Sequence, residues 1–162
     1  MDTKDDSNKL VKLKSTDGQL FEIEDNCLDR AKFFKNLKDI MNLNNEINVD
    51  ADSKSLKRII EYLKHYLNEE PKAIPKPLPS SDLKQVLDEW DYNFISSLSL
   101  EETVDLINAA NYMGIGELVN LCSSRIASEM RNCSIDEARA KFGLVADMSE
   151  EEIKECTTYP LD

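Results

Sequence analysis

The chain has 162 residues, enough for one sizeable hydrophobic core or two small ones, and its 41% hydrophobic and 32% charged residues are typical of a soluble globular protein. No apolar run approaches bilayer length, and the acidic N-terminus MDTKDDSNK lacks the features of a signal or transit peptide, so we expect a cytoplasmic and nuclear protein that is not bound to a membrane. The net charge of −12 is uneven: residues 1–68 carry −1 and residues 69–162 carry −11, so the second half should repel nucleic acid and attract a basic partner.

A β-hairpin is predicted near the N-terminus. Residues 10–14 and 19–23 alternate apolar and polar side chains on either side of the segment STDG, and an Asp-Gly pair favours a tight turn. Four of the apolar side chains are expected to face a core: Val11, Leu13, Phe21 and Ile23.

A helix, a strand and a second helix are predicted after the hairpin. The apolar spacing over residues 26–43 predicts one helix, and the short β-branched segment 47–49 predicts a third strand. Asp52 is placed to cap the second helix. The apolar residues of that helix recur at helical spacing: Leu56, Ile59, Ile60, Leu63 and Leu67. His65 lies off this stripe and is expected on the surface. The order predicts a small α/β unit whose sheet is covered by helices.

A proline-rich segment separates this unit from the rest of the chain. Residues 69–81, EEPKAIPKPLPSS, hold four of the five prolines, which excludes a helix interior or a central strand and predicts a linker or an ordered extended loop. Trp90, the only tryptophan, comes after it and is expected to anchor the returning chain on a core.

Two amphipathic helices joined by a short glycine turn are predicted over residues 98–131. Ser99 and Glu102 have the spacing of a capping box, in which each side chain accepts a hydrogen bond from a backbone N–H at the helix start. Gly114 and Gly116 are expected to take the positive φ values that favour a helix end.

The tyrosine near the end of the first of these helices, Tyr112, has two interpretations. A large apolar ring with one polar tip suits a protein interface. The alternative is that the ring packs at the rim of the protein's own core.

Two further helices are predicted beyond residue 131. Ser134 with Glu137 and Ser149 with Glu152 repeat the capping-box spacing, and Gly143 is placed to end the first of the two helices.

The sequence offers no constellation for catalysis or for a cofactor. His65 is the only histidine, and the four cysteines, at positions 27, 122, 133 and 156, form no C-x-x-C pair, so we expect neither a metal site nor a disulfide framework. The glycines at 114 and 116 follow no strand, which disfavours a phosphate-binding loop. A DNA-binding helix-turn-helix over residues 98–131 is disfavoured, because the segment contains five acidic residues and only two basic ones, Arg125 and Arg131.

Several motifs in order resemble the S-phase kinase-associated adaptor family. They are KLKSTDGQLFEIE, LKRIIEYLKHY, WDYNF, INAANYMGIGELVNLCSSRIASEM, SIDEARAKFGL and a DMSEEE segment, so the resemblance covers nearly the whole chain. It implies a BTB/POZ fold of the α+β class, with a small three-stranded sheet covered by helices and a C-terminal helical extension. It also implies an adaptor without an active site or cofactor, which links F-box proteins to the cullin of an SCF ubiquitin ligase in ubiquitin-dependent protein degradation.

The resemblance further implies domain bounds and binding residues. The BTB/POZ domain would comprise residues 10–68 and 90–131 around a loop at 69–89, with a flexible segment 1–9 before it and F-box-binding helices over 132–162 after it. Asn111 and Tyr112 match the cullin-facing pair of the family. The F-box-facing positions are Val119, Ile126, Met130, Phe142 and Leu144. A weak homodimer is expected in the absence of a partner.

Some positions depart from the family pattern. The helix over 27–41 matches poorly, Asn108 stands where the family has an apolar residue, and Gly116 replaces part of a more basic turn. The chain ends CTTYPLD, without a tryptophan-containing tail. The acidic segment 147–152 has no proline after Ser149, which excludes the hydroxylation known at that point in some relatives. These differences leave a second hypothesis: a structural or assembly protein that binds F-box partners through the same fold without a cullin.

Overall fold

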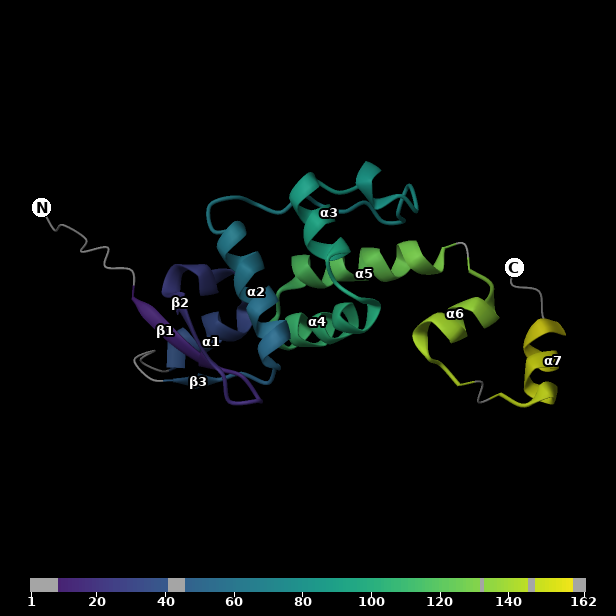
Figure 1. Cartoon of the computed structure of the whole chain (residues 1–162), viewed down its shortest axis with the longest axis horizontal. Coiled ribbons are helices and arrows are strands. Elements are labelled where there is room, and N and C mark those ends of the chain that lie inside the picture. Colours follow the sequence, from purple (N-terminus) through teal and green to yellow (C-terminus); the bar gives the residue numbers. More distant parts are fainter. Residues whose placement is uncertain (1–8, 41–45, 132, 146–147, 159–162) are drawn as a thin grey trace, which may run out of the picture. The chain divides into compact units, whose positions relative to one another are not determined.

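The computed structural model describes residues 9–40, 46–131, 133–145 and 148–158, and it contains two compact units, residues 1–129 and 130–162 (Figure 1). Most of the predicted flexible segment 1–9 and the end of the helix predicted over 26–43 therefore lie outside the described residues. Within the described part of the chain, no helix is long and apolar enough to cross a membrane.

The first unit begins with the predicted hairpin. Strands β1 (Leu10–Lys14) and β2 (Leu20–Glu24) are antiparallel, and β3 (Ile47–Asn48) joins β1 in parallel, so the sheet order is β2-β1-β3. The register pairs Val11 with Ile23 and Leu13 with Phe21. All of these side chains except the half-buried Phe21 are buried, because alternate residues of a strand share one face. The fold class, a small three-stranded sheet with helices, is as predicted.

The prediction of a single helix over residues 26–43 is wrong, because the helical conformation is interrupted at Ala31. A 3-10 helix η1 (Asp25–Arg30) comes first, Ala31 is extended with φ −95° and ψ 115°, and α1 (Lys32–Ile40) follows. Cys27, Leu28, Ala31 and Phe34 are all buried. The apolar spacing therefore continues through the break, since both short helices bury side chains in the same core.

The helix α2 (Ser53–His65) lies against α4 (Leu100–Met113) and carries the predicted cap and stripe. The Asp52 carboxylate accepts a hydrogen bond from the Ser55 N–H at 2.6 Å. Leu56, Ile59, Ile60 and Leu63 are buried as predicted, and Leu67 is half-buried.

Aromatic rings join the end of α2 to α3 (Glu89–Ser96). The exposed His65 ring stacks on Trp90, with centroids 3.7 Å apart and planes 2° apart, so Trp90 anchors the returning chain as predicted. Tyr62 and Tyr66 also contact Trp90. The buried Tyr66 hydroxyl donates a hydrogen bond of 2.7 Å to Asp91, which is only 4% exposed.

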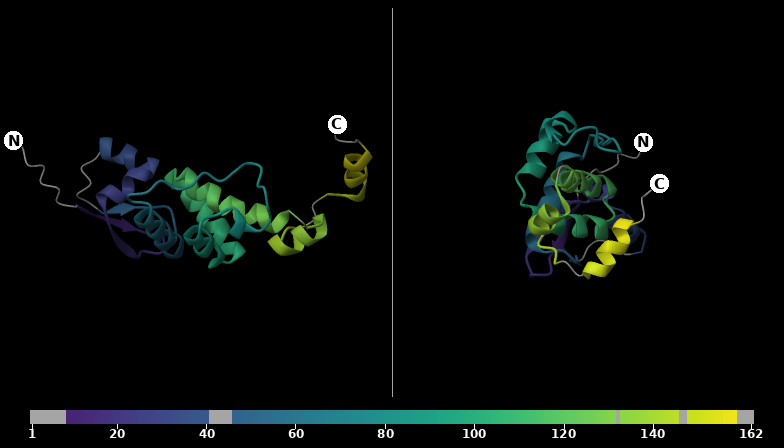
Figure 2. Two further views of the ribbon diagram at one scale, coloured as in Figure 1. Left: turned by 90° about the horizontal axis from the view of Figure 1, so that it is seen from above. Right: turned by 90° about the vertical axis from the view of Figure 1, so that its right-hand side faces the viewer.

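The proline-rich segment 69–81 is an ordered loop, and a short 3-10 helix, η2 (Leu83–Gln85), follows it. The Lys76 ammonium group donates to the Asn120 side chain at 2.8 Å, and the Ser128 hydroxyl donates to the Ser81 carbonyl at 2.9 Å. The loop therefore runs along α5 (Gly116–Met130), as Figure 2 shows.

The helix α4 (Leu100–Met113) begins at the predicted capping box and ends at Gly114, whose φ of +70° is left-handed. The Ile115 N–H then donates to the Ala110 carbonyl at 2.9 Å, which satisfies a carbonyl of the last turn. The positive φ predicted for Gly116 is wrong, because Gly116 is already the first residue of α5.

The core of the first unit is formed by side chains from the sheet, from η1 and from helices α1 to α5. Its largest fully buried side chains are Tyr62, Phe34, Leu13, Ile23, Leu28, Leu56, Ile59, Leu63, Ile95, Leu106, Met113 and Ile115.

The second unit contains α6 (Ile135–Phe142) and α7 (Glu150–Thr158), both with the predicted start signals. The Ser134–Glu137 capping box is complete, and Gly143 ends α6 with a φ of +64°. At the start of α7, the Ser149 N–H donates to Glu152 at 2.7 Å. None of the side chains of α6 is buried in this structure.

Candidate protein-interaction surfaces

The last turn of α4 presents Asn111 and Tyr112, which the family resemblance assigns to cullin binding. Asn111 is exposed and Tyr112 is 43% exposed, whereas the neighbouring Ala110 and Met113 are fully buried. The left-handed Gly114 stops the helix directly after this turn. The pair therefore stands at the end of a helix that is fixed by its buried face.

Phe33 of α1 packs against the Tyr112 ring. The two ring centroids are 5.1 Å apart with planes at 40°, and Phe33 in turn meets the buried Phe34 edge-on at 5.0 Å. The first turn of α1 also approaches Gly114 closely, because a Cβ atom placed there would lie 2.9 Å from the Lys32 Cβ. The Tyr112 ring therefore packs against Phe33 on one side and is exposed to solvent on the other. This arrangement is compatible with both interpretations offered by the sequence.

A hollow of about 420 Å³ adjoins the exposed side of Tyr112. Its lining comes from the β-hairpin turn, the end of β1 and the residues after β3: Lys14, Ser15, Thr16, Gly18, Asn48, Val49, Asp50 and Tyr112. Sequence reasoning did not find Phe33 or this hollow, since both depend on contacts between segments far apart in the chain.

The positions matched to F-box binding are divided between the two units. Val119 and Ile126 are both half-buried and lie seven residues apart on α5, which places them on one side of the helix. Met130, the last residue of α5, is 44% exposed. In the second unit Phe142 is half-buried and Leu144 is 60% exposed.

The second unit exposes further apolar side chains beside these positions. Ile135 is 72% exposed and Val145 is 87% exposed, although the family resemblance assigns neither of them to F-box binding. Large apolar side chains exposed on so small a unit mark a surface that a partner can cover.

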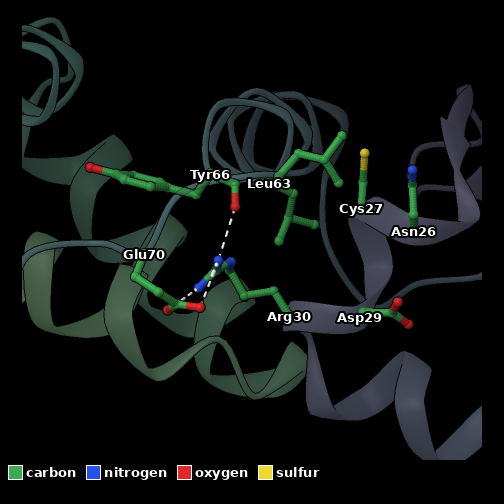
Figure 3. A pocket seen from close by; sticks show the side chains of 8 residues that line it. Asn26, Cys27, Asp29, Arg30, Leu63, Tyr66 and Glu70 are labelled. Atoms are coloured by element: carbon green, nitrogen blue, oxygen red, sulfur yellow. Dashed lines mark hydrogen bonds and ion pairs between the residues drawn. The ribbon is translucent and has the colours of Figure 1, made fainter.

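A separate pocket of about 300 Å³ lies between η1 and the end of α2 (Figure 3). Its one basic group is already engaged: the Arg30 guanidinium donates to Glu70 at 2.9 Å, to the Tyr66 carbonyl at 2.9 Å and to the Glu69 carbonyl at 2.8 Å. Cys27 points toward Leu63 in this view. The arrangement holds the start of the proline-rich loop onto η1.

The described residues form no group of three or more His, Cys, Asp or Glu side chains that could hold a metal ion. Burial raises the pKa of the Cys122 thiol to about 12 and also raises the pKa of Cys27, so neither supplies a thiolate nucleophile near neutral pH. The surfaces described above are suited to binding other proteins.

Comparison with known proteins finds similarity along nearly the whole chain. A family profile described as "Skp1 family, tetramerisation domain" matches residues 9–68. The chain is 30% identical over 149 residues to the S-phase kinase-associated protein 1 homolog of Tetrahymena thermophila, covering 91% of this chain and 90% of that protein. It is 31% identical over 157 residues to SKP1-like protein 15 of Arabidopsis thaliana, covering 92% and 87%.

A third relative carries a more specific description. The E3 ubiquitin ligase complex SCF subunit sconC of Arthroderma otae is 29% identical over 144 residues, covering 88% of this chain and 87% of that protein. Similarity of this extent, together with the match to the family profile, shows that the chain belongs to the Skp1 family.

Proposed function

We propose that this protein is an adaptor subunit of an SCF-type ubiquitin ligase, which bridges an F-box protein to a cullin and has no active site of its own. The observation that carries the proposal is the near-full-length similarity to a protein described as an SCF subunit. The exposed Tyr112 on α4 and the exposed apolar side chains around α6 support it, because each of the two units exposes apolar side chains that a partner can cover.

On this proposal, Asn111 and Tyr112 contact the cullin. Replacing both with lysine removes the Tyr112 ring and the Asn111 amide from the contact and places two charges where complex formation strips them of water. Truncation of a central interface aromatic costs about 2 kcal/mol or more, so we expect cullin affinity to fall at least about thirtyfold. F-box binding should be unchanged.

The chain offers a matched control for this variant. Tyr92 and Asn93 are an adjacent Tyr-Asn pair on α3, with Tyr92 half-buried and Asn93 exposed. Replacing this pair with lysines adds the same charge, and we expect it to leave cullin affinity nearly unchanged. Affinities of both variants for the cullin would be measured by titration calorimetry, with thermal melts to establish folding. Equal affinity for parent and Asn111/Tyr112 variant would contradict the assignment.

Ile126, in the first unit, and Phe142, in the second unit, are each proposed to contact the F-box. Each alanine variant removes apolar area that the complex buries, and we expect each to weaken F-box binding about tenfold. Val104→Ala is a suitable control, since Val104 is a similarly exposed apolar residue, 42% exposed on α4, that is proposed to contact neither partner. In the parent, amide exchange between Cys122 and Glu155 should slow when an F-box protein is added. Slow exchange in the free protein that an F-box protein does not change would contradict this role.

Affinity purification of the full chain separates this proposal from the assembly-protein hypothesis. Recovery of both a cullin and F-box proteins supports the adaptor, whereas F-box proteins without any cullin would favour the alternative.

A further inference from the structure

The first turn of α1 carries an unbalanced positive charge beside Tyr112. Lys32 and Lys35 are three residues apart, are both exposed, and form no salt bridge within the described part of the chain. The nearby hollow is more nearly neutral, because it contains Lys14 and Asp50 and the Lys14 ammonium group already pairs with Glu46 at 3.0 Å.

The position of these lysines in α1 is unfavourable for the isolated helix. The N-terminal end of a helix dipole is positive and favours acidic residues in the first turn. Helices α3 to α7 all have acids there, whereas α1 and α2 have none, and α2 instead has the Asp52 carboxylate at its N-cap. The lysines add to the positive end of the dipole, so the start of α1 is a local region of positive potential in a chain of net charge −12.

This region is continuous with the surface assigned to the cullin. Phe33, between the two lysines in sequence, contacts the Tyr112 ring at 5.1 Å, and the Lys32 stem lies against Gly114. A partner that covers Tyr112 must therefore also cover or flank the start of α1. At physiological ionic strength charges are screened beyond roughly 8 Å, so the lysines act on groups of the partner that dock beside Tyr112.

We propose that Lys32 and Lys35 form a basic rim of the Tyr112 surface and that the cullin segment docked there is acidic. This inference rests on the proposed function and adds the charge of the partner's contact surface. The rest of the chain repels an acidic partner, so the rim selects the orientation in which the partner approaches.

The test is a double charge reversal, Lys32→Glu with Lys35→Glu, in the full chain bound to an F-box protein. Association with the co-purifying cullin would be measured at about 50 mM and about 300 mM salt, between which the Debye length falls about 2.5-fold. We expect the association rate constant to fall about tenfold at the lower salt and by less at the higher salt, because rim charges act mainly on association. Glutamates in a first helical turn are favoured by the dipole, so folding should be retained.

The matched control is Lys54→Glu with Lys57→Glu. These lysines have the same spacing and exposure near the start of α2 and change the net charge equally, but Lys54 faces Glu102 of α4. We expect the control to change the association rate constant by less than about twofold, and Lys32→Arg with Lys35→Arg to retain the parental value.

The outcomes separate the two proposals. If the parent binds no cullin, the proposed function fails. If the parent binds and the Lys32/Lys35 reversal associates at the parental rate, or if both reversals slow association equally, the basic rim is refuted while the adaptor function stands.

Discussion

The hydrogen bond between Tyr66 and Asp91 should stabilise the first unit by an amount that depends on pH. The bond spans 2.7 Å, joins α2 to α3 and is buried, with Tyr66 5% and Asp91 4% exposed. The perturbation is Tyr66→Phe, which removes the hydroxyl and keeps the ring that packs on Trp90 and Tyr62.

The expected cost follows from what remains after the substitution. A hydrogen bond to a charged group contributes about 1.5–3 kcal/mol, and leaving its buried acceptor without a donor incurs the desolvation cost. We therefore expect the free energy of unfolding to fall by about 2 kcal/mol at neutral pH. For a unit of this size, with about 3–5 °C for each kcal/mol, the melting temperature should fall by about 6–10 °C.

The sign of the pH dependence follows from the Asp91 carboxyl. Burial raises its pKa above the ordinary value of 3.8, and the Tyr66 hydroxyl opposes that rise. Between the unfolded and the raised folded pKa, the folded protein holds a proton that the unfolded chain has released, so stability falls as pH rises through this window. Removing the hydroxyl raises the folded pKa further. The deficit of Tyr66→Phe should thus be smallest, about 1 kcal/mol, at acid pH where Asp91 is protonated, and become full once Asp91 is ionised in both folded proteins.

The assay is urea unfolding at several pH values between about 4.5 and 8. In an Asp91→Asn background, the loss caused by Tyr66→Phe should shrink to about 1 kcal/mol and no longer vary with pH. Tyr92→Phe is the control, since Tyr92 is half-buried and its ring contacts Lys84. A deficit that is constant across the pH range and unchanged by Asp91→Asn would refute the reasoning.

Three further predictions concern individual contacts. Gly114→Ala should lower the free energy of unfolding by at least about 1–2 kcal/mol, because it adds left-handed strain and a clash with α1. Gly18→Ala, at φ +83° with open space around it, should cause the strain alone, and chemical denaturation of both variants compares the two losses. Arg30→Ala should destabilise the first unit by about 1–2 kcal/mol, because it removes two hydrogen bonds to backbone carbonyls. Glu70→Ala should have a much smaller effect, because that carboxylate is exposed, and the melting temperatures of the two variants test this order. Cys122 should resist alkylation at about pH 8 until the protein unfolds, as followed by mass spectrometry, and rapid modification of the native protein would show that the thiol is accessible.

Element starts can be predicted where the stabilising contacts are local. The capping residues Ser99, Ser134 and Ser149 each bond to a group three residues away, so the signal is contained in a few adjacent letters of the sequence. The hairpin is likewise predictable to within one residue at the start of β2, because its turn and alternating strands are contiguous.

Elements that depend on distant contacts cannot be predicted in the same way. The break at Ala31 leaves the apolar spacing intact, since η1 and α1 bury their side chains in one core, and no glycine or proline marks it. The two glycines after α4 look alike in sequence, yet only Gly114 meets the start of α1. The contact of Phe33 with Tyr112 also joins segments almost eighty residues apart, so only the exposed pair itself could be named, and only through the family resemblance.

The stack of His65 on Trp90 gives the protein an internal optical probe. The indole of Trp90, the only tryptophan of the sequence, lies parallel to the His65 ring at 3.7 Å, so its emission depends on this contact. Because the two rings belong to α2 and α3, the emission should change if these helices separate. Unlabelled protein can thus report whether α3 stays docked.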